Sequence, residues 1–347
     1  MKKLSIVAVI LTTLISCKKE TKTVTQVDPK TGDTIQVEVP VVEEKVAEPT
    51  NAIIDSAGIY KQSFILEEGK SYPFISSQKD VHQLTAPTGE KQTVTNQSTD
   101  EVTFKVDQIV NDIYDITISF VGKKTTQSGN GQSVTIDTRT AAPKEENLKN
   151  KWSIDKALTG NQLKMKMNKN GKILSITGFD PIYSKINTAL GSITKDAKIK
   201  SELLNDTKKG FNENVLKNQF SNNILVLPLK GAKIGEKWTK SENASQDGKI
   251  KLTTTYTLKS IENGIAEITV VGGIPKQSDK VEQNGFTHTI SSELSQNGII
   301  KFDQKSGWIN TQNITVKTTE SQTITDGKEK RTMGSVTTSN IMVNPTT

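Results

Sequence analysis

Cysteine is almost absent from the sequence, because Cys17 is the only one among 347 residues. No disulfide can form within the chain, so burial of apolar side chains must supply its stability even in an oxidising compartment. The length is sufficient to bury a sizeable core in one large domain or two smaller ones.

Residues that carry common chemistry are also scarce. His82 and His288 are the only histidines, and neither lies in an H-x-x-x-H or H-E-x-x-H spacing, so a zinc site would need carboxylates from distant segments. The sequence has no G-x-S-x-G nucleophile motif, no phosphate-binding G-x-x-x-x-G-K-S/T loop and no D-x-D-x-D calcium loop. We therefore predict that the protein is not an enzyme and has no catalytic residues, metal or cofactor.

Arginine and aromatic residues are few. Arginine occurs only at Arg139 and Arg331, and lysine is spread along the sequence among aspartate and glutamate. The net charge of +7 becomes +5 without Lys2 and Lys3, and no basic cluster indicates nucleic acid binding. Aromatic residues make up 5% of the sequence, and the three tryptophans lie far apart, where a core or rim position is the simpler interpretation than a sugar-binding platform.

Long apolar runs are absent after the first residues. The run at residues 4–15 is too short to cross a bilayer, and it follows Lys2 and Lys3, as in a secretory signal peptide. It ends in Leu14-Ile15-Ser16-Cys17, which resembles the lipobox of bacterial lipoproteins. The resemblance implies a signal peptide at residues 1–16 and a lipid on Cys17, although a signal peptide cleaved elsewhere is the alternative.

A lipid on Cys17 predicts where the protein resides. Two or more acyl chains anchor a protein stably without a transmembrane helix. Lys18 and Lys19 stand where enterobacterial lipoproteins retained at the inner membrane have aspartate, so the expected location is the outer membrane of the cell envelope, facing the periplasm or the outside.

Residues 17–58 are predicted to form a flexible tether behind the lipid. They are rich in Lys, Glu, Thr, Val and Pro and show no helical spacing. Residues 23–27 and 34–39 could alternatively pair as a hairpin, but an isolated hairpin is marginally stable in water.

From residue 59 onward, apolar and polar residues alternate in segments separated by turn residues. Val102, Phe104 and Val106 share one side of a segment, with Thr103 and Lys105 on the other. Half-buried antiparallel strands produce this alternation.

The β segments form two similar halves. Residues 106–120 match residues 258–272 without a gap at a constant offset of 152, which aligns Asn111 with Asn263 at predicted tight turns. In both halves a glycine shortly before an aromatic residue precedes this match, and a glycine-containing hairpin follows it. We interpret the pattern as an internal duplication.

Helical spacing occurs only between the halves. Ile182, Ile186 and Leu190 lie four residues apart, and Asp180-Pro181 indicates a helix start. The helices can serve either as a core element on the sheet or as a movable lid over a cavity, and the sequence leaves both interpretations open.

The predicted fold is therefore mainly β (α+β). Two duplicated antiparallel halves form an open half-barrel or curved sheet, with the helical insert packed on one face. The duplicated β domain spans residues 59–347, with its first half at 59–180, the insert at 181–224 and its second half at 225–347.

These features together resemble a known family. The lipobox, the tether, the glycine before Tyr72 and before Trp238, and the two asparagine turns look like an uncharacterised flavobacterial (Bacteroidota) lipoprotein family of unknown function. The resemblance covers roughly residues 60–344 and is structural, so it implies no activity. More loosely, the architecture resembles the open half-barrels of envelope lipoproteins that carry acyl chains.

Two functions follow from these predictions. In the first, the lipoprotein binds a lipid or other apolar ligand on the apolar sheet face, lined by Phe104, Val106, Ile116, Ile118, Tyr256, Leu258, Ile268 and Val270. In the second, the same residues form a filled core, and the protein is a structural lipoprotein that contacts another envelope protein. The medium to large side chains at these positions favour a filled interior or a narrow pocket.

Overall fold

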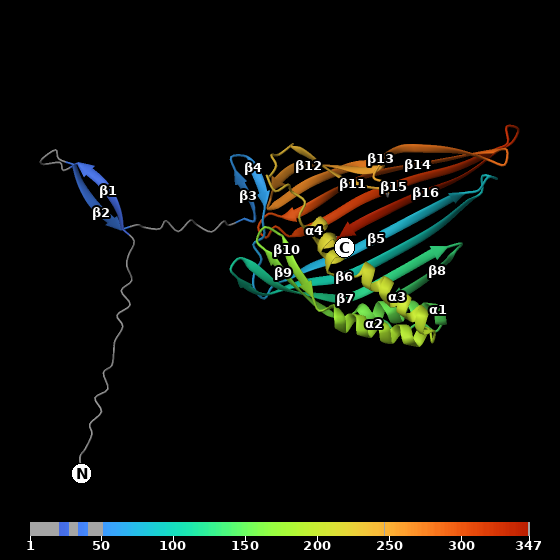
Figure 1. Ribbon diagram of the computed structural model, residues 1–347, viewed down its shortest axis with the longest axis horizontal. Helices are drawn as coiled ribbons and strands as arrows, with labels where there is room; N and C mark the ends of the chain where they lie inside the picture. Colours follow the sequence, from blue (N-terminus) through green and yellow to red (C-terminus); the bar gives the residue numbers. More distant parts are fainter. Residues whose placement is uncertain (1–20, 28–33, 41–50, 246, 346–347) are drawn as a thin grey trace, which may run out of the picture. The chain divides into compact units, whose positions relative to one another are not determined.

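The computed structural model describes residues 21–27, 34–40, 51–245 and 247–345 of the chain (Figure 1). The predicted signal peptide and Cys17 lie outside these residues. The chain divides into two compact units, Met1–Glu48 and Pro49–Thr347.

The first unit contains one small antiparallel sheet. Strand β1 (Thr21–Val27) pairs with β2 (Thr34–Pro40), with Val24 opposite Val37. This is the hairpin that was the alternative to a structureless tether, and the rest of the predicted tether up to residue 50 lies outside the described residues.

The second unit is built on a 12-stranded antiparallel sheet that does not close on itself among the described residues. From edge to edge the strand order is β10-β9-β7-β6-β5-β16-β15-β14-β13-β12-β11, and β8 pairs with the far part of β7. The strands are β5 Ser71–Thr85, β6 Lys91–Val110, β7 Ile113–Gly129, β8 Gln132–Asp137, β9 Gln162–Asn168, β10 Ile173–Thr177, β11 Lys237–Asn243, β12 Lys251–Glu262, β13 Ile265–Gln283, β14 Phe286–Asp303, β15 Ile309–Thr325 and β16 Lys330–Val343. The prediction of a mainly β fold with an open antiparallel sheet is confirmed.

The strand order repeats in the way that an internal duplication predicts. Strands β5, β6, β7, β9 and β10 follow one another across the first half, and β11 to β15 do the same across the second. Asn111 and Asn263 occupy the corresponding turns β6–β7 and β12–β13, with φ of 49° and 52°. Asparagine tolerates this left-handed conformation, which two-residue hairpin turns require. Strand β16 lies between the two halves and pairs with both β15 and β5.

The folded unit begins earlier than residue 59. A short hairpin, β3 (Ile53–Ser56) with β4 (Ile59–Gln62), precedes the large sheet. Ala52 and Ile53 are fully buried, and the backbone nitrogen of Ala52 donates to the carbonyl of Gln304 at 3.0 Å. Residues 51–58, which were assigned to the tether, therefore include part of the core.

In the described residues four helices lie on one face of the sheet, and α3 packs mainly on α2 (Figure 1). Helices α2 (Phe179–Ile193), α3 (Ala197–Gly210) and α4 (Glu213–Ile224) confirm the predicted insert, while α1 (Glu146–Leu158) in the first half was not predicted. Ile182, Ile186 and Leu190 are the buried residues of α2, as their spacing indicated. The helix begins at Phe179 after an N-cap at Gly178, two residues before the predicted start.

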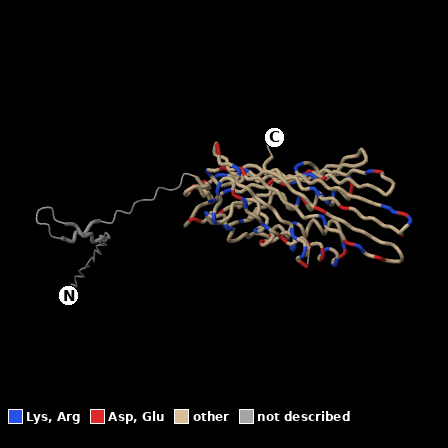
Figure 2. Tube along the Cα trace, turned by 90° about the horizontal axis from the view of Figure 1, so that it is seen from above, with Lys and Arg blue, Asp and Glu red and all other residues tan. Residues whose placement is uncertain are grey.

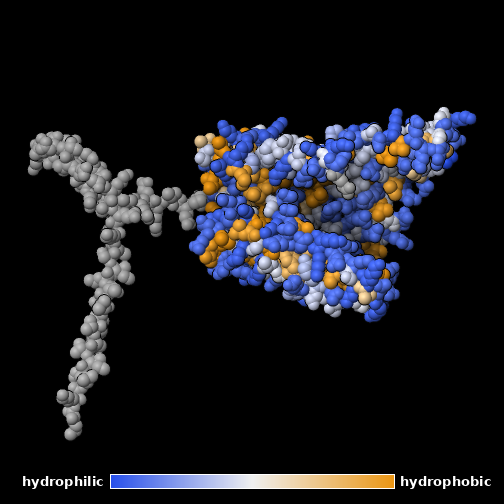
Figure 3. All heavy atoms as spheres, viewed as in Figure 1, coloured by the Kyte–Doolittle hydropathy of each residue, from blue (hydrophilic) through white to orange (hydrophobic). Residues whose placement is uncertain are grey.

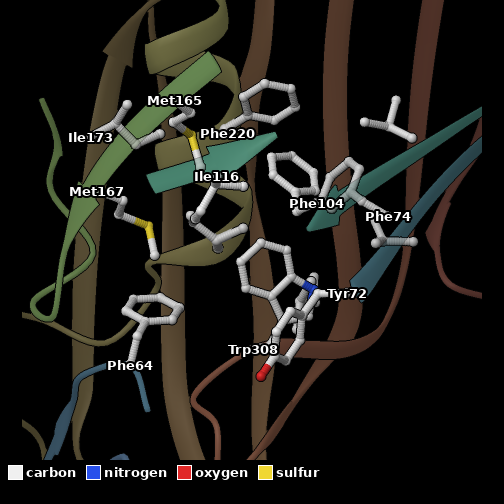
Figure 4. Close-up of a cluster of buried hydrophobic side chains, with 14 of the residues drawn as sticks. Phe64, Tyr72, Phe74, Phe104, Ile116, Met165, Met167, Ile173, Phe220 and Trp308 are labelled. Atoms are coloured by element: carbon white, nitrogen blue, oxygen red, sulfur yellow. The ribbon is translucent and has the colours of Figure 1, made fainter. Parts of the chain in front are cut away.

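An aromatic cluster forms the centre of the core (Figure 4). The Phe104 ring lies 5.0 Å from that of Phe220 in α4 and 5.2 Å from that of Trp308 in the second half. Phe104 therefore contacts both the Phe220 ring of α4 and the Trp308 ring of the second half, and the burial of Phe220 makes α4 a core element.

Candidate functional site

The eight residues predicted to line a ligand site come together, but they do so in the closed core. All except Tyr256 are at most 1% exposed, and Tyr256 is half-buried with its ring stacked on that of Trp238 at 5.8 Å. They belong to, or pack against, one buried apolar cluster that also includes Leu216, Phe220 and Ile224 of α4. Phe104, Val106, Ile116, Ile118, Tyr256, Leu258, Ile268 and Val270 border neither of the two cavities described next.

The first cavity lies at the tips of the long strands, and we call it the strand-tip cavity. Strands β5, β6 and β13 to β16 continue well past α4, and the surface is hollowed there (Figures 1 and 3). The cavity has a volume of ≈ 570 Å³. Its lining consists of Leu84, Thr85, Ala86, Pro87, Glu90, Gln92, Ile290, Ser291, Ser292, Glu320, Ser321, Gln322, Met333, Gly334 and Ser335.

Strand register brings three apolar side chains to this cavity. Ile290 in β14 lies opposite Gln322, which lies opposite Met333 in β16. Leu84 in β5 lies opposite Ser335 in β16. Ser335 is two residues from Met333 and therefore lies on the same face of β16. Leu84 and Ile290 are each 52% exposed and Met333 is 42% exposed, so the cavity presents large apolar side chains to solvent.

The second cavity lies between the sheet and helices α1 and α4, and we call it the helix-side cavity. Its volume is ≈ 260 Å³, and Phe120, Leu158, Phe211 and Leu216 are among its apolar lining residues. Asp155 in α1 also lines it, although this side chain is only 8% exposed. Burial raises the pKa of the Asp155 carboxyl above its usual range, and this effect outweighs the opposing charges of Lys123 and Lys151.

Carboxylates on the opposite face of the sheet form ordinary ion pairs. Asp115 pairs with Lys166 at 2.6 Å and Asp107 with Lys164 at 3.0 Å. The pKa of Asp107 is lowered mainly by the hydrogen bond from the Thr117 hydroxyl. Partly exposed pairs of this kind contribute little stability and carry no chemistry of their own.

Histidines and acidic residues do not assemble into a metal site among the described residues. The ring of His82 is half-buried and its Nδ1 lies 2.9 Å from the hydroxyl of Thr337. Basic and acidic residues are interspersed over the larger unit (Figure 2). In the part of the chain that the structure describes, no helix has the length and apolarity needed to span a bilayer.

Comparison with known proteins gives a family. A family model described as a family of unknown function (DUF6263) matches residues 111–309, which is more than half of the chain. No curated protein sequence matches the chain.

Three solved structures that the chain resembles are remote likenesses. A structure titled for lipid–protein interactions in lipovitellin has a TM-score of 0.35 and 10% identity over 80% of this chain, which spans 25% of the lipovitellin chain. OccK5 (OpdH) of Pseudomonas aeruginosa has a TM-score of 0.20 and 6% identity over 80% of this chain and 99% of its own. An outer membrane channel of Pseudomonas putida F1 has a TM-score of 0.18 and 8% identity over 83% of this chain and 99% of its own. Such low scores assign neither a fold family nor a ligand.

Proposed function

We propose that this chain, which belongs to the family of unknown function DUF6263, is a non-enzymatic lipoprotein of the outer membrane that binds an acyl chain. The strand-tip cavity supports this proposal more than any other feature of the described residues. In this proposal the lipid on Cys17 anchors the protein to the envelope, and the cavity holds the ligand.

The composition of the strand-tip cavity favours an apolar ligand. Large apolar side chains at Leu84, Ile290 and Met333 are exposed together, which soluble proteins tend to avoid unless the patch binds something. Its volume of ≈ 570 Å³ lies within the usual range for small-molecule sites, about 300–1,000 Å³. The surrounding Ser, Gln and Glu side chains can keep the protein soluble when the cavity is empty, and they can bind a polar headgroup at the rim of the cavity.

Because the core is filled, we place the expected ligand in the strand-tip cavity and not among the residues that the sequence suggested. A ligand among these eight residues would have to displace buried rings such as Phe104 and Phe220, at a cost of several kcal/mol. The strand-tip cavity needs no such displacement because its apolar side chains are already exposed.

Lipid binding can be tested on the chain without residues 1–17. Organic extracts of the purified protein are expected to contain acyl compounds by mass spectrometry, and a fluorescent fatty acid is expected to bind the delipidated protein. The double substitution Ile290→Thr with Met333→Thr should weaken this binding about tenfold, because two apolar contacts are lost while β-branched residues keep the strands intact.

Val271→Thr provides the matched control. Val271 is an exposed β-strand residue at 60% exposure, and its register places it on the opposite face of β13 from the buried Val270. Clean extracts together with no binding of the fluorescent fatty acid, or equal weakening by Val271→Thr, would contradict the proposal.

A second function is favoured by the filled core itself. A lipoprotein whose apolar residues only stabilise its sheet can instead contact an envelope protein through its exposed strands and edges. Crosslinking in intact cells that recovers a specific protein, together with extracts free of acyl compounds, would support this function over lipid binding.

A further inference from the structure

The helix-side cavity contains a carboxyl group without a partner. The Asp155 side chain is 8% exposed, and among the described residues no donor lies within hydrogen-bonding distance of its Oδ2. An isolated buried carboxylate is costly, so such a group is either protonated or paired with a ligand. Because the strand-tip cavity has no lining residue in common with this one, the inference does not depend on the proposed lipid site.

Two basic residues at or beside the cavity are already paired with other carboxylates. The ammonium group of Lys123 pairs with Asp100 at 2.7 Å, and the Arg139 guanidinium pairs with Glu101. Asp100, Glu101 and Lys123 line the cavity together with Asp155. Lys151 acts on Asp155 only through its charge and forms no ion pair with it. The cavity thus has one carboxyl group in excess of its paired basic groups.

Much of the remaining lining is apolar and partly aromatic, although Ser76, Thr159 and Gln219 also border the cavity. The Phe120 ring lies 5.6 Å from the Phe211 ring in an edge-to-face arrangement, and Leu158 and Leu216 complete this side. Aromatic rings favour cations as well as apolar groups. A ligand in this cavity would therefore meet a carboxyl group together with aromatic and aliphatic side chains.

We propose that the helix-side cavity binds a small organic amine. Its ammonium group pairs with the Asp155 carboxyl group, and its apolar body lies against Phe120 and Phe211. A neutral apolar molecule would leave the carboxyl group without a donor, and an anion would lie beside a carboxyl group that is itself unpaired. A metal ion would need more ligands than Asp155 can supply, because no cluster of three metal-binding side chains occurs among the described residues.

The amine site can be tested with simple probes and the chain without residues 1–17. Phenethylamine, benzylamine, isopentylamine and cyclohexylamine are titrated at millimolar concentration by saturation-transfer NMR and calorimetry. At least one amine is expected to bind, and its matching alcohol is expected to bind about tenfold more weakly, because the charged hydrogen bond is lost.

Two substitutions test the site independently, one by removing the charge of its carboxyl group and one by blocking the cavity. Asp155→Asn should weaken amine binding about tenfold, whereas Asp180→Asn, at an exposed carboxylate in α2, should not change it. Gln219→Trp, at an exposed lining position, should block the cavity without disturbing the core, whereas Asn218→Trp, at the exposed position before it, should not.

Three results would overturn the proposal. They are no binding by any of the four amines, equal affinity for an amine and its alcohol, and unchanged binding in both Asp155→Asn and Gln219→Trp. Thermal unfolding of each variant shows whether it is folded. If Asp155→Asn does not fold, the Gln219→Trp and Asn218→Trp pair decides.

Discussion

At the scale of single residues, the side chain of Gln62 joins three distant segments. Its Nε2 donates to the carbonyl of Ile224 at 2.8 Å and to that of Gly307 at 3.1 Å. Its Oε1 accepts from the backbone nitrogens of Val226 and Leu227 at 3.2 and 3.3 Å. Both donors of the amide and both acceptor positions of its oxygen are therefore satisfied inside the protein. This residue holds the end of α4 against the β14–β15 turn.

Gln62→Leu should lower the free energy of unfolding by about 3 kcal/mol, because it leaves buried backbone donors and acceptors without partners. Urea denaturation followed by tryptophan fluorescence measures the change. Gln132→Leu, at an exposed strand position, is the matched control and should change stability by less than about 0.5 kcal/mol. Equal effects of the two substitutions would show that the Gln62 hydrogen bonds contribute nothing specific.

Asp155 should make the protein less stable as the pH rises. Because the folded state raises the pKa of this carboxyl, it binds the proton more tightly than the unfolded chain does. The free energy of unfolding therefore falls from about pH 3.9, the usual pKa of aspartate, through the raised folded-state pKa. In the absence of ligand, Asp155→Asn should raise stability at pH 7 by about 1–3 kcal/mol, and this gain should disappear near pH 4.

Asp107→Asn is the control for this pH dependence. The folded state lowers the pKa of Asp107, through Thr117 first and then Lys164. Asp107 therefore stabilises the fold above its usual pKa, and this contribution is lost as the pH falls through the lowered folded-state pKa. Its substitution should destabilise the protein at pH 7, the opposite sign to Asp155→Asn. The same sign for both substitutions in urea titrations across pH 4–7 would contradict the assignment.

At the scale of elements, the helices of the insert differ in how they are held. Helix α4 buries Leu216, Phe220 and Ile224, whereas α3 has no buried residue. Local opening costs least where few apolar contacts are lost. The amides of α3 should therefore exchange with deuterium at least about tenfold faster than those of α4 at the same pH. Equal protection of the two helices in exchange mass spectrometry would mean that the insert opens as one unit.

Elements that the sequence predicts well are those with strong local patterns. The alternation of Val102, Phe104 and Val106 predicts β6, and the spacing of Ile182, Ile186 and Leu190 predicts α2, since each pattern follows from one buried face. Helix α1 lacks such a stripe, because Asp155 is its only buried residue and its apolar side chains are half-buried. Its partial burial depends on α2, β7 and β8, and a local pattern does not reveal these contacts.

The cavities could not be predicted because they depend on long-range pairing. Leu84 and Met333 are 249 residues apart in the sequence (333 − 84) and reach the same cavity only because β16 pairs with β5. The partners of Gln62 and the isolation of Asp155 are likewise set by segments distant in sequence. Side-chain size did indicate a filled interior at Phe104 and its neighbours.

At the scale of the whole molecule, the last strand joins the duplicated halves into one sheet. Strand β16 pairs with β15 along one side and with β5 along the other. After it, the Asn344 side chain accepts a hydrogen bond from the backbone nitrogen of Ile75 at 2.8 Å and donates to the carbonyl of Pro73 at 3.2 Å. A duplicated protein without this strand would expose two additional sheet edges, which favour aggregation. The strand also supplies Met333 to the strand-tip cavity.

The proposed location depends on Cys17, which lies outside the described residues. Diacylglycerol on its sulfur would bury two acyl chains, and each methylene contributes about 0.8 kcal/mol to membrane binding. Cys17→Ala should therefore leave the protein out of the membrane fraction, or leave its precursor uncleaved, whereas Lys18→Ala should remain processed and bound to membranes. Fractionation of cells expressing the full chain, with immunoblotting of precursor and mature forms, measures both effects. If the Cys17→Ala protein is processed and sediments with the envelope as the wild type does, the envelope attachment comes from somewhere other than a lipid on this residue.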